Sequence, residues 1–235
     1  MQKTICLLIL TWNAVAKTPN NTERDEIMKL HAEVRENVEP PARMMMLLNY
    51  SLKLENLTEA WLKNCSYIFP DAKLYPAYAG MNYTIMSSDP KPTLTFADLK
   101  KFVAQKDKYN LTTNNCSAGV CEDYKQMVWA TSTHVGCAKH QCSFLNHSSE
   151  YAACIYKPSG DLENGRPYEV GQSCSGCPAG YLCDRKQCYL PGGETFTTTS
   201  ISSRLPLCGI LHTTMLPIYL IMHISSVKIL TWNDP

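Results

Sequence analysis

The sequence predicts an α+β layered domain, because helical patterns come first, strand-like segments come later, and the two do not alternate. Four apolar residues recur at helical spacing near the start of the chain, at Ile27, Leu30, Val34 and Val38. Two short apolar segments of β-forming composition follow much later. We expect these segments, Gln126–Ala130 and Tyr151–Tyr156, to be paired central strands.

Capping patterns and apolar stripes predict three helices. A capping box at Thr22–Asp25 opens the first helix, which ends near Glu36 ahead of two prolines. The second runs from about Leu52 to Cys65, and the third follows a capping box at Thr95–Asp98. The apolar sides of the second and third helices comprise Leu54, Leu57, Trp61 and Leu62, and Leu99, Phe102 and Val103.

Turn residues and cysteines predict the structure of the segments between these elements. Residues 66–92 hold five Pro or Gly residues and are predicted to be loop. Cys116–Cys121 is expected to form a tight loop. Val135–Cys142, between the two expected central strands, is predicted to be a further strand.

Composition excludes some classes of function. The chain has 235 residues, of which 45% are hydrophobic, so it can bury a sizeable core. Lys and Arg number 22 against 21 Asp and Glu. This balance excludes a nucleic-acid binder that depends on a basic excess to displace counterions from phosphates.

The first sixteen residues predict export from the cell. A basic start ending at Lys3 precedes an apolar run, Ile5–Leu10, and the A-x-A cleavage pattern Ala14–Ala16. Residues 1–16 therefore read as a signal peptide, since the apolar run is too short to span a bilayer. We expect a secreted, extracellular protein.

Twelve cysteines fit an oxidising compartment. Ten lie between Cys65 and Cys188, which predicts five disulfides; Cys6 is removed with the predicted signal peptide, and Cys208 is left over. Four of the ten fall in residues 173–190, a segment too small to form a core of its own. A zinc ribbon is the alternative for this module, although secretion favours disulfides.

The sequence contains eight Asn-x-Ser/Thr triplets, each a potential glycan site on a secreted chain. Two of them, at Asn64 and Asn115, directly precede a cysteine, so they are not counted among the predicted glycan sites. Glycans are predicted at Asn20, Asn49, Asn56, Asn82, Asn110 and Asn146.

The C-terminal tail, residues 191–235, combines a Ser/Thr-rich linker with an apolar segment. Leu205–Ile224 carries no formal charge and is long enough to span a membrane. Prolines and histidines interrupt it, so secretion is preferred, and anchoring through this tail is the alternative.

Three stretches carry a family resemblance. They are Pro40–Cys65, Tyr124–Trp129 followed by Val135–Cys137, and Cys154–Gly160 followed by Pro167-Tyr168. They resemble the signatures of the CAP superfamily, which includes cysteine-rich secretory proteins, insect antigens and plant pathogenesis-related proteins. The resemblance covers about residues 24–190. Within the family, it is closest to the venom-allergen-like (SCP/TAPS) proteins of parasitic flatworms.

The resemblance implies a three-layer α-β-α sandwich over residues 17–172, followed by a cysteine-rich hinge over 173–190. It also implies a set of disulfide pairs. These are Cys65–Cys142, Cys137–Cys154, Cys116–Cys121, Cys174–Cys183 and Cys177–Cys188.

Members of the family usually have a cavity in which two His and two Glu can hold a divalent metal. Carried over residue by residue, these four positions fall on Phe69, Met81, Gln105 and Asp123. One carboxylate is a poor metal site. We therefore expect no metal, no cofactor and no enzymatic activity. Of the remaining histidines, His31 is expected to be a packed or rim residue, and His134 and His140 to lie on the surface.

The resemblance instead implies binding of a sterol or a fatty acid. The fatty-acid groove would lie between the first and third helices, and the sterol loop around Tyr109–Leu111 and on to Cys121. The lipid-binding residues so predicted are Leu30, Val34, Leu99, Phe102, Val103, Tyr109 and Leu111. Apolar stripes at helical spacing are more often core, so this prediction rests on the resemblance. The resemblance to flatworm proteins implies that this binding takes place at a host–parasite interface. The alternative function is a glycosylated protein-interaction or immunomodulatory module that binds a host protein without lipid.

Overall fold

A computed structural model describes residues 17–88, 93–117, 119–144 and 147–192. The predicted signal peptide, Asn146, Cys208 and the tail beyond residue 192 lie outside the described residues.

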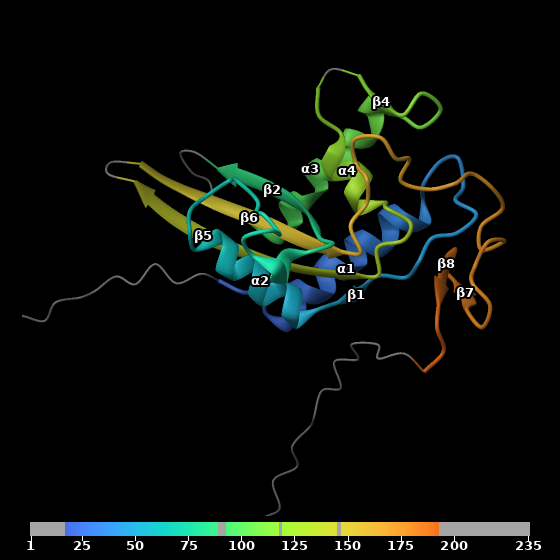
Figure 1. Cartoon of the computed structure of the whole chain (residues 1–235), viewed down its shortest axis with the longest axis horizontal. Coiled ribbons are helices and arrows are strands. Elements are labelled where there is room, and N and C mark those ends of the chain that lie inside the picture. Colours follow the sequence, from blue (N-terminus) through green and yellow to red (C-terminus); the bar gives the residue numbers. More distant parts are fainter. Residues whose placement is uncertain (1–16, 89–92, 118, 145–146, 193–235) are drawn as a thin grey trace, which may run out of the picture. The chain divides into compact units, whose positions relative to one another are not determined.

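The centre of the fold is a four-stranded sheet in the order β1-β5-β6-β2 (Figure 1). Its strands are β1 (Asn49–Tyr50), β2 (Asn82–Ser88), β5 (His134–Phe144) and β6 (His147–Lys157). β5 pairs with both β1, in parallel, and β6, antiparallel, and β2 runs antiparallel to β6. The long β5–β6 pair provides the rigid middle layer.

Helices cover both faces of this sheet. They are α1 (Asn21–Glu36), α2 (Leu52–Leu62), α3 (Lys100–Val103) and α4 (Glu122–Met127), with 3-10 turns η1 (Pro76–Tyr78), η2 (Phe96–Leu99) and η3 (Ala104–Lys108). Alternate residues of β5 face opposite layers. Val135 and Cys137 pack with residues of α1, α3 and α4, whereas Ala138 and Cys142 pack with Trp61 of α2. The result is the α-β-α sandwich that the resemblance implies.

Several local predictions are wrong. The cap of α1 is Asn20, two residues before the predicted Thr22, and it exchanges bonds of 2.9 Å with Glu23. Gln126–Ala130 is not a strand, because Gln126 lies in the last turn of α4 and β6 pairs with β5 and β2 instead. The second helix ends at Leu62, and Cys65 has a left-handed φ of 52°.

Residues 66–92 are not all loop, because Asn82–Ser88 forms the edge strand β2. His140 is also not on the surface, since it is only 7% exposed. It lies on the side of β5 that α2 covers. His31, in contrast, is fully buried in α1, as expected.

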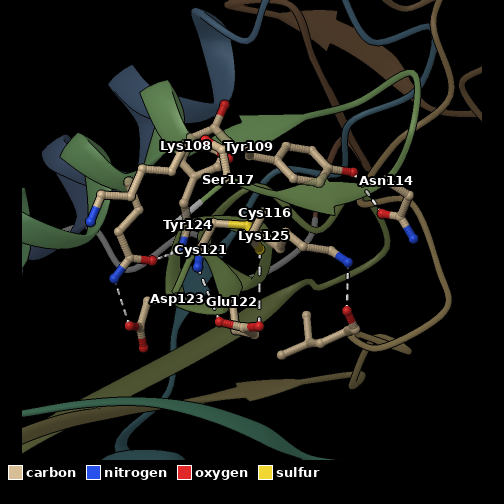
Figure 2. Close-up of a disulfide and its surroundings, with 12 residues drawn as sticks. Lys108, Tyr109, Asn114, Cys116, Ser117, Cys121, Glu122, Asp123, Tyr124 and Lys125 are labelled. Atoms are coloured by element: carbon tan, nitrogen blue, oxygen red, sulfur yellow. Dashed lines mark hydrogen bonds between the residues drawn. A yellow bond between two sulfur atoms is a disulfide. The ribbon is translucent and has the colours of Figure 1, made fainter. Parts of the chain in front are cut away.

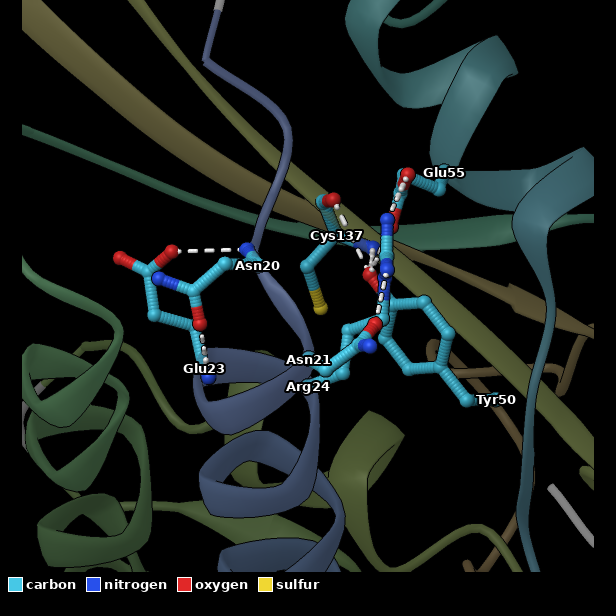
Figure 3. Close-up of polar contacts among 7 residues, drawn as sticks. All are labelled: Asn20, Asn21, Glu23, Arg24, Tyr50, Glu55 and Cys137. Carbon is cyan, nitrogen blue, oxygen red and sulfur yellow. Dashed lines mark hydrogen bonds and ion pairs between the residues drawn. The ribbon is translucent and has the colours of Figure 1, made fainter. Parts of the chain in front are cut away.

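A partly buried ion pair joins the two long helices (Figure 3). Arg24 of α1 donates from Nε and Nη2 to the two carboxylate oxygens of Glu55 in α2, both at 2.8 Å. Tyr50 of β1 donates its hydroxyl proton to the same carboxylate at 2.7 Å. The backbone of β5 approaches closely here, since a Cβ on Gly136 would lie 2.2 Å from the Glu55 nitrogen.

The structure contains five disulfides, the same pairs that the resemblance implies. Two of them cross-link the hairpin β7 (Leu182–Asp184) and β8 (Gln187–Tyr189) to the preceding loop. Cys188 also bonds through its backbone to Met45 at 2.6 Å and Leu47 at 2.8 Å. The cysteine-rich module is therefore fastened to the sandwich. In the described part of the chain, no helix combines the length and apolarity that a membrane crossing requires.

Candidate functional site

The candidate site is built around a small hairpin, β3 (Tyr109–Asn110) and β4 (Asn115–Cys116), shown in Figure 2. The Cys116–Cys121 disulfide closes the chain directly after it. Arg166 donates from Nε to the carbonyl of Leu111 at 2.9 Å and from Nη2 to that of Thr112 at 2.8 Å. Asn114 donates to the carbonyl of Asn164 at 3.0 Å. These bonds hold the turn of the hairpin against residues 161–168.

Two cavities meet at this turn. The first has a volume of about 830 Å³ and extends to the cysteine-rich module; its walls include Arg43, Met44, Trp129, Arg166 and Val170. The second, about 460 Å³, lies under the hairpin, with Tyr109, Asn110 and Tyr124 in its wall. Both are lined by Pro40, Leu111, Thr112 and Tyr168. Each volume falls within the range of small-molecule sites.

Buried Arg35 positions one wall of the first cavity. It is 1% exposed, and its guanidinium donates to main-chain carbonyls of Met127 and Trp129 at 3.0 and 2.8 Å. It also donates to the carbonyl of Met46 at 2.7 Å, across the gap between two segments of the wall. Burial lowers the pKa of Arg35 to about 9. The sequence predicts that Gln126–Ala130 is a strand. In the structure, bonds from the side chain of Arg35 take the place of the main-chain bonds that a neighbouring strand would make to this segment.

The aromatic residues of the second cavity stay neutral at physiological pH. Burial raises the pKa of Tyr109 and of Tyr168 to about 12 each, and it raises that of Tyr124 as well. Tyr109 donates its hydroxyl proton to Asn114 at 2.9 Å. Lys125 lies 5.5 Å from the centre of the Tyr109 ring, and burial lowers its pKa. The wall of the second cavity therefore combines apolar aromatic rings with the polar hydroxyl groups of its tyrosines.

The predicted lipid-binding residues fall into two groups. Val34, Leu99 and Phe102 are buried in the core cluster between α1 and α3. Leu30 and Val103 are partly buried against the same cluster. Tyr109 and Leu111 line the cavities at the hairpin. Sequence reasoning missed Arg166, Tyr168 and Trp129 as cavity residues, although two of the three lie within the quoted motifs.

The four positions where the resemblance places metal ligands do not fit a divalent cation. Phe69 stacks on Tyr83 at 4.7 Å between ring centres, and Met81 is buried in the apolar cluster beneath α2. Gln105 donates to Asp123 at 2.8 Å, so the one carboxylate already has an amide partner. A phenyl ring and a thioether are not ligands for zinc-like ions.

One further group could in principle hold a metal, among the residues that the structure describes. It consists of Cys65, His140 and Cys142. The two sulfur atoms are joined in a disulfide, so they are not available as thiolate ligands.

Comparisons with known proteins agree with this fold. The family model of the cysteine-rich secretory protein family, CAP, matches residues 28–156. GLIPR1-like protein 1 of Bos taurus is 33% identical over 200 residues, which cover 79% of this chain and 80% of that protein. Peptidase inhibitor 15 of Xenopus laevis is 31% identical over 185 residues, covering 71% and 70%.

Two solved structures show the same architecture. Venom allergen-like protein 4 of Schistosoma mansoni aligns with a TM-score of 0.52 and 26% identity, covering 68% of this chain and 100% of that one. Hookworm platelet inhibitor aligns with a TM-score of 0.53 and 19% identity, covering 73% and 92%. The second likeness concerns the fold alone. With its sandwich, its five disulfides and a family match over more than half of its length, the chain belongs to the cysteine-rich secretory protein (CAP) family.

Proposed function

We propose that this chain is a secreted, non-enzymatic protein that binds a lipid, either a sterol or a fatty acid, in the cavities at the β3–β4 hairpin. The observation that carries this proposal is the position of Leu111. It lies in the loop that the resemblance links to sterol binding, and it is one of the residues that line both cavities. Burying hydrocarbon there contributes about 0.8 kcal/mol per methylene before ordering costs.

The chemistry of the walls supports binding rather than catalysis. Among the residues that the structure describes, neither cavity is lined by a histidine or a cysteine, and the basic and acidic groups of the first are partly paired. Arg43, for example, lies 3.1 Å from Glu169. A nucleophile with an adjacent general base is the arrangement expected of a hydrolase. The likeness to a flatworm protein supports a role at a host–parasite interface.

Uptake of lipid tests the proposal. Delipidated protein should bind labelled cholesterol or palmitate at micromolar concentration, and no uptake of either overturns the function. Two matched variants locate the ligand, because Leu30 and Leu111 are both partly buried leucines of one cluster. We expect Leu111→Gln to weaken binding about tenfold or more, and Leu30→Gln to leave it nearly unchanged. The reverse result would place the ligand between α1 and α3.

A second candidate function is binding of a host protein without lipid. Between α2 and η1 the chain exposes large apolar side chains, with Ile68 at 81% and Leu74 at 75%. Exposed apolar patches of this kind are typical of protein interaction sites. Binding of a host protein should then survive delipidation and be lost in Ile68→Ser/Leu74→Ser. Loss on deleting residues 173–190 instead would assign the contact to the cysteine-rich module.

A further inference from the structure

The predicted glycan site at Asn110 coincides with the walls of both cavities. Asn110, Leu111 and Thr112 are the three residues of one acceptor triplet. All three line the second cavity, and Leu111 and Thr112 also line the first. A modification of this triplet therefore lies in the wall that the two cavities share.

The geometry of Asn110 leaves its reactive atom available. The residue is exposed, and its Oδ1 accepts a hydrogen bond from the backbone nitrogen of Thr113 at 3.1 Å. A glycan attaches to Nδ2, so this bond persists in the modified residue. In the transfer, Nδ2 loses a proton and bonds to the first sugar's C1, and a lipid-linked diphosphate leaves as the C1–oxygen bond breaks.

Asn82, another acceptor in the sequence, has the opposite geometry. Its Nδ2 donates to the carbonyl of Gly160 at 2.7 Å, and the contact is partly buried. A sugar on this nitrogen would have to fit into the partly buried contact between β2 and the segment after β6. The folded protein therefore accommodates a glycan at Asn110 and not at Asn82.

We propose that Asn110 carries an N-linked glycan whose first sugars stand over the shared mouth of the two cavities and slow the entry and exit of the ligand. This proposal rests on the proposed lipid-binding function. A steric gate raises the barrier that binding and release share, so it changes both rates by the same factor and leaves the dissociation constant unchanged.

A matched pair of substitutions tests the gate on the full chain secreted from eukaryotic cells. Thr112→Ser keeps an acceptor triplet, whereas Thr112→Val keeps the side-chain shape and removes the hydroxyl that glycan transfer requires. Peptide mass mapping should find Asn110 occupied in the wild type and in Thr112→Ser, bare in Thr112→Val, and Asn82 bare in all three.

Stopped-flow uptake and release of a fluorescent sterol and a fluorescent fatty acid then measure the rates. Removing the whole glycan enzymatically after folding should raise both rates about tenfold in the wild type and in Thr112→Ser, with an unchanged dissociation constant. The same treatment should change neither rate in Thr112→Val. Each variant is compared only with itself, because Thr112 lines both cavities and its substitution can change the affinity.

An unmodified Asn110 overturns the proposal, and so do equal rates in glycosylated and trimmed protein. In either case binding itself can still be observed, and the proposed function stands. If neither form binds a sterol or a fatty acid, the lipid-binding function fails and the gate fails with it.

Discussion

The side chain of Gln105 donates from Nε2 to Oδ2 of Asp123 at 2.8 Å, at two of the four positions where the family resemblance places metal ligands. The other end of the same amide accepts from the backbone nitrogen of Tyr124 at 3.2 Å. Burial raises the pKa of Asp123, and the bond from Gln105 opposes this shift. The side-chain amide of Gln105 thus takes the place beside the Asp123 carboxylate that a metal cation would otherwise occupy.

Asp123→Asn should flatten part of the pH dependence of stability. Because the folded pKa of Asp123 is raised, the folded state holds a proton that the unfolded state releases above pH 3.8. Stability from this group is therefore full below that pH and is lost as pH rises through the folded pKa. Melting temperatures from pH 3.5 to 7 should fall less with pH in the variant. Parallel curves would contradict a raised pKa.

His31→Gln should remove a dependence of the opposite sign. His31 is fully buried, and burial lowers its pKa from 6.5 to about 4. The unfolded state takes up a proton below pH 6.5 and the folded state only near pH 4, so stability falls by roughly 3 kcal/mol as pH drops through this window. Urea unfolding at pH 7.5 and 4.5 measures the difference. A wild-type protein equally stable at both values would refute the burial argument.

The histidine should also exist in one tautomer. Its Nδ1 lies 2.7 Å from the carbonyl of Ile27 and its Nε2 lies 2.8 Å from the hydroxyl of Tyr156. The carbonyl can only accept, so Nδ1 carries the proton and Nε2 accepts from the tyrosine. Nitrogen chemical shifts at neutral pH should identify the Nδ1-H form, and an Nε2-H form would rule this network out.

Arg35→Lys should destabilise the protein by about 3 kcal/mol or more, although it keeps the charge. An ammonium cannot reach the carbonyls of Met46, Met127 and Trp129 together, which leaves buried acceptors without donors. Arg185→Lys is the control, since Arg185 forms an exposed ion pair with Glu36 and should lose less than about 1 kcal/mol. Equal losses in denaturant titrations would count against the role of Arg35.

Gly136→Ala should separate β5 from α2. The new Cβ would lie 2.2 Å from the Glu55 nitrogen and 2.6 Å from the Ser51 carbonyl oxygen, and backbone atoms cannot rotate away. We expect a loss of about 2 kcal/mol or more, measured by thermal unfolding. Gly119→Ala has open space around it and only a strained φ of 103°, so it should cost about 1 kcal/mol. If Gly136→Ala leaves the thermal stability unchanged, β5 and α2 are not in close contact at this position.

The parts of the fold that could be predicted from the sequence are those specified by local chemistry. Apolar residues at helical spacing predict α1, and the β-forming residues of Tyr151–Tyr156 predict a strand. Both elements form where expected. β2 was missed because only one of its seven residues, Thr84, is fully buried, so no apolar alternation identifies it. Pairing with β6, far away in the sequence, is what makes this segment a strand.

Other errors have a similar long-range cause. Val128 and Trp129 suggest a strand by composition, but the carbonyls around them bond to Arg35, 92 to 95 residues earlier, rather than to a neighbouring strand. A polar residue such as His140 is expected to be exposed. It is buried because β5 is covered on both faces. The cavity walls were mostly invisible for the same reason, since Pro40, Leu111 and Tyr168 meet only after folding.

Arg43 packs between Gly171, just ahead of the cysteine-rich module, and Gly176 within it, since a Cβ on either glycine would lie 2.8 Å from its side chain. Because Gly176 also shares the wall of the first cavity with Trp129 of the sandwich, both parts of the chain form that cavity. A change of sequence in the terminal module would therefore alter the cavity wall without altering the residues of the two hydrophobic clusters of the sandwich.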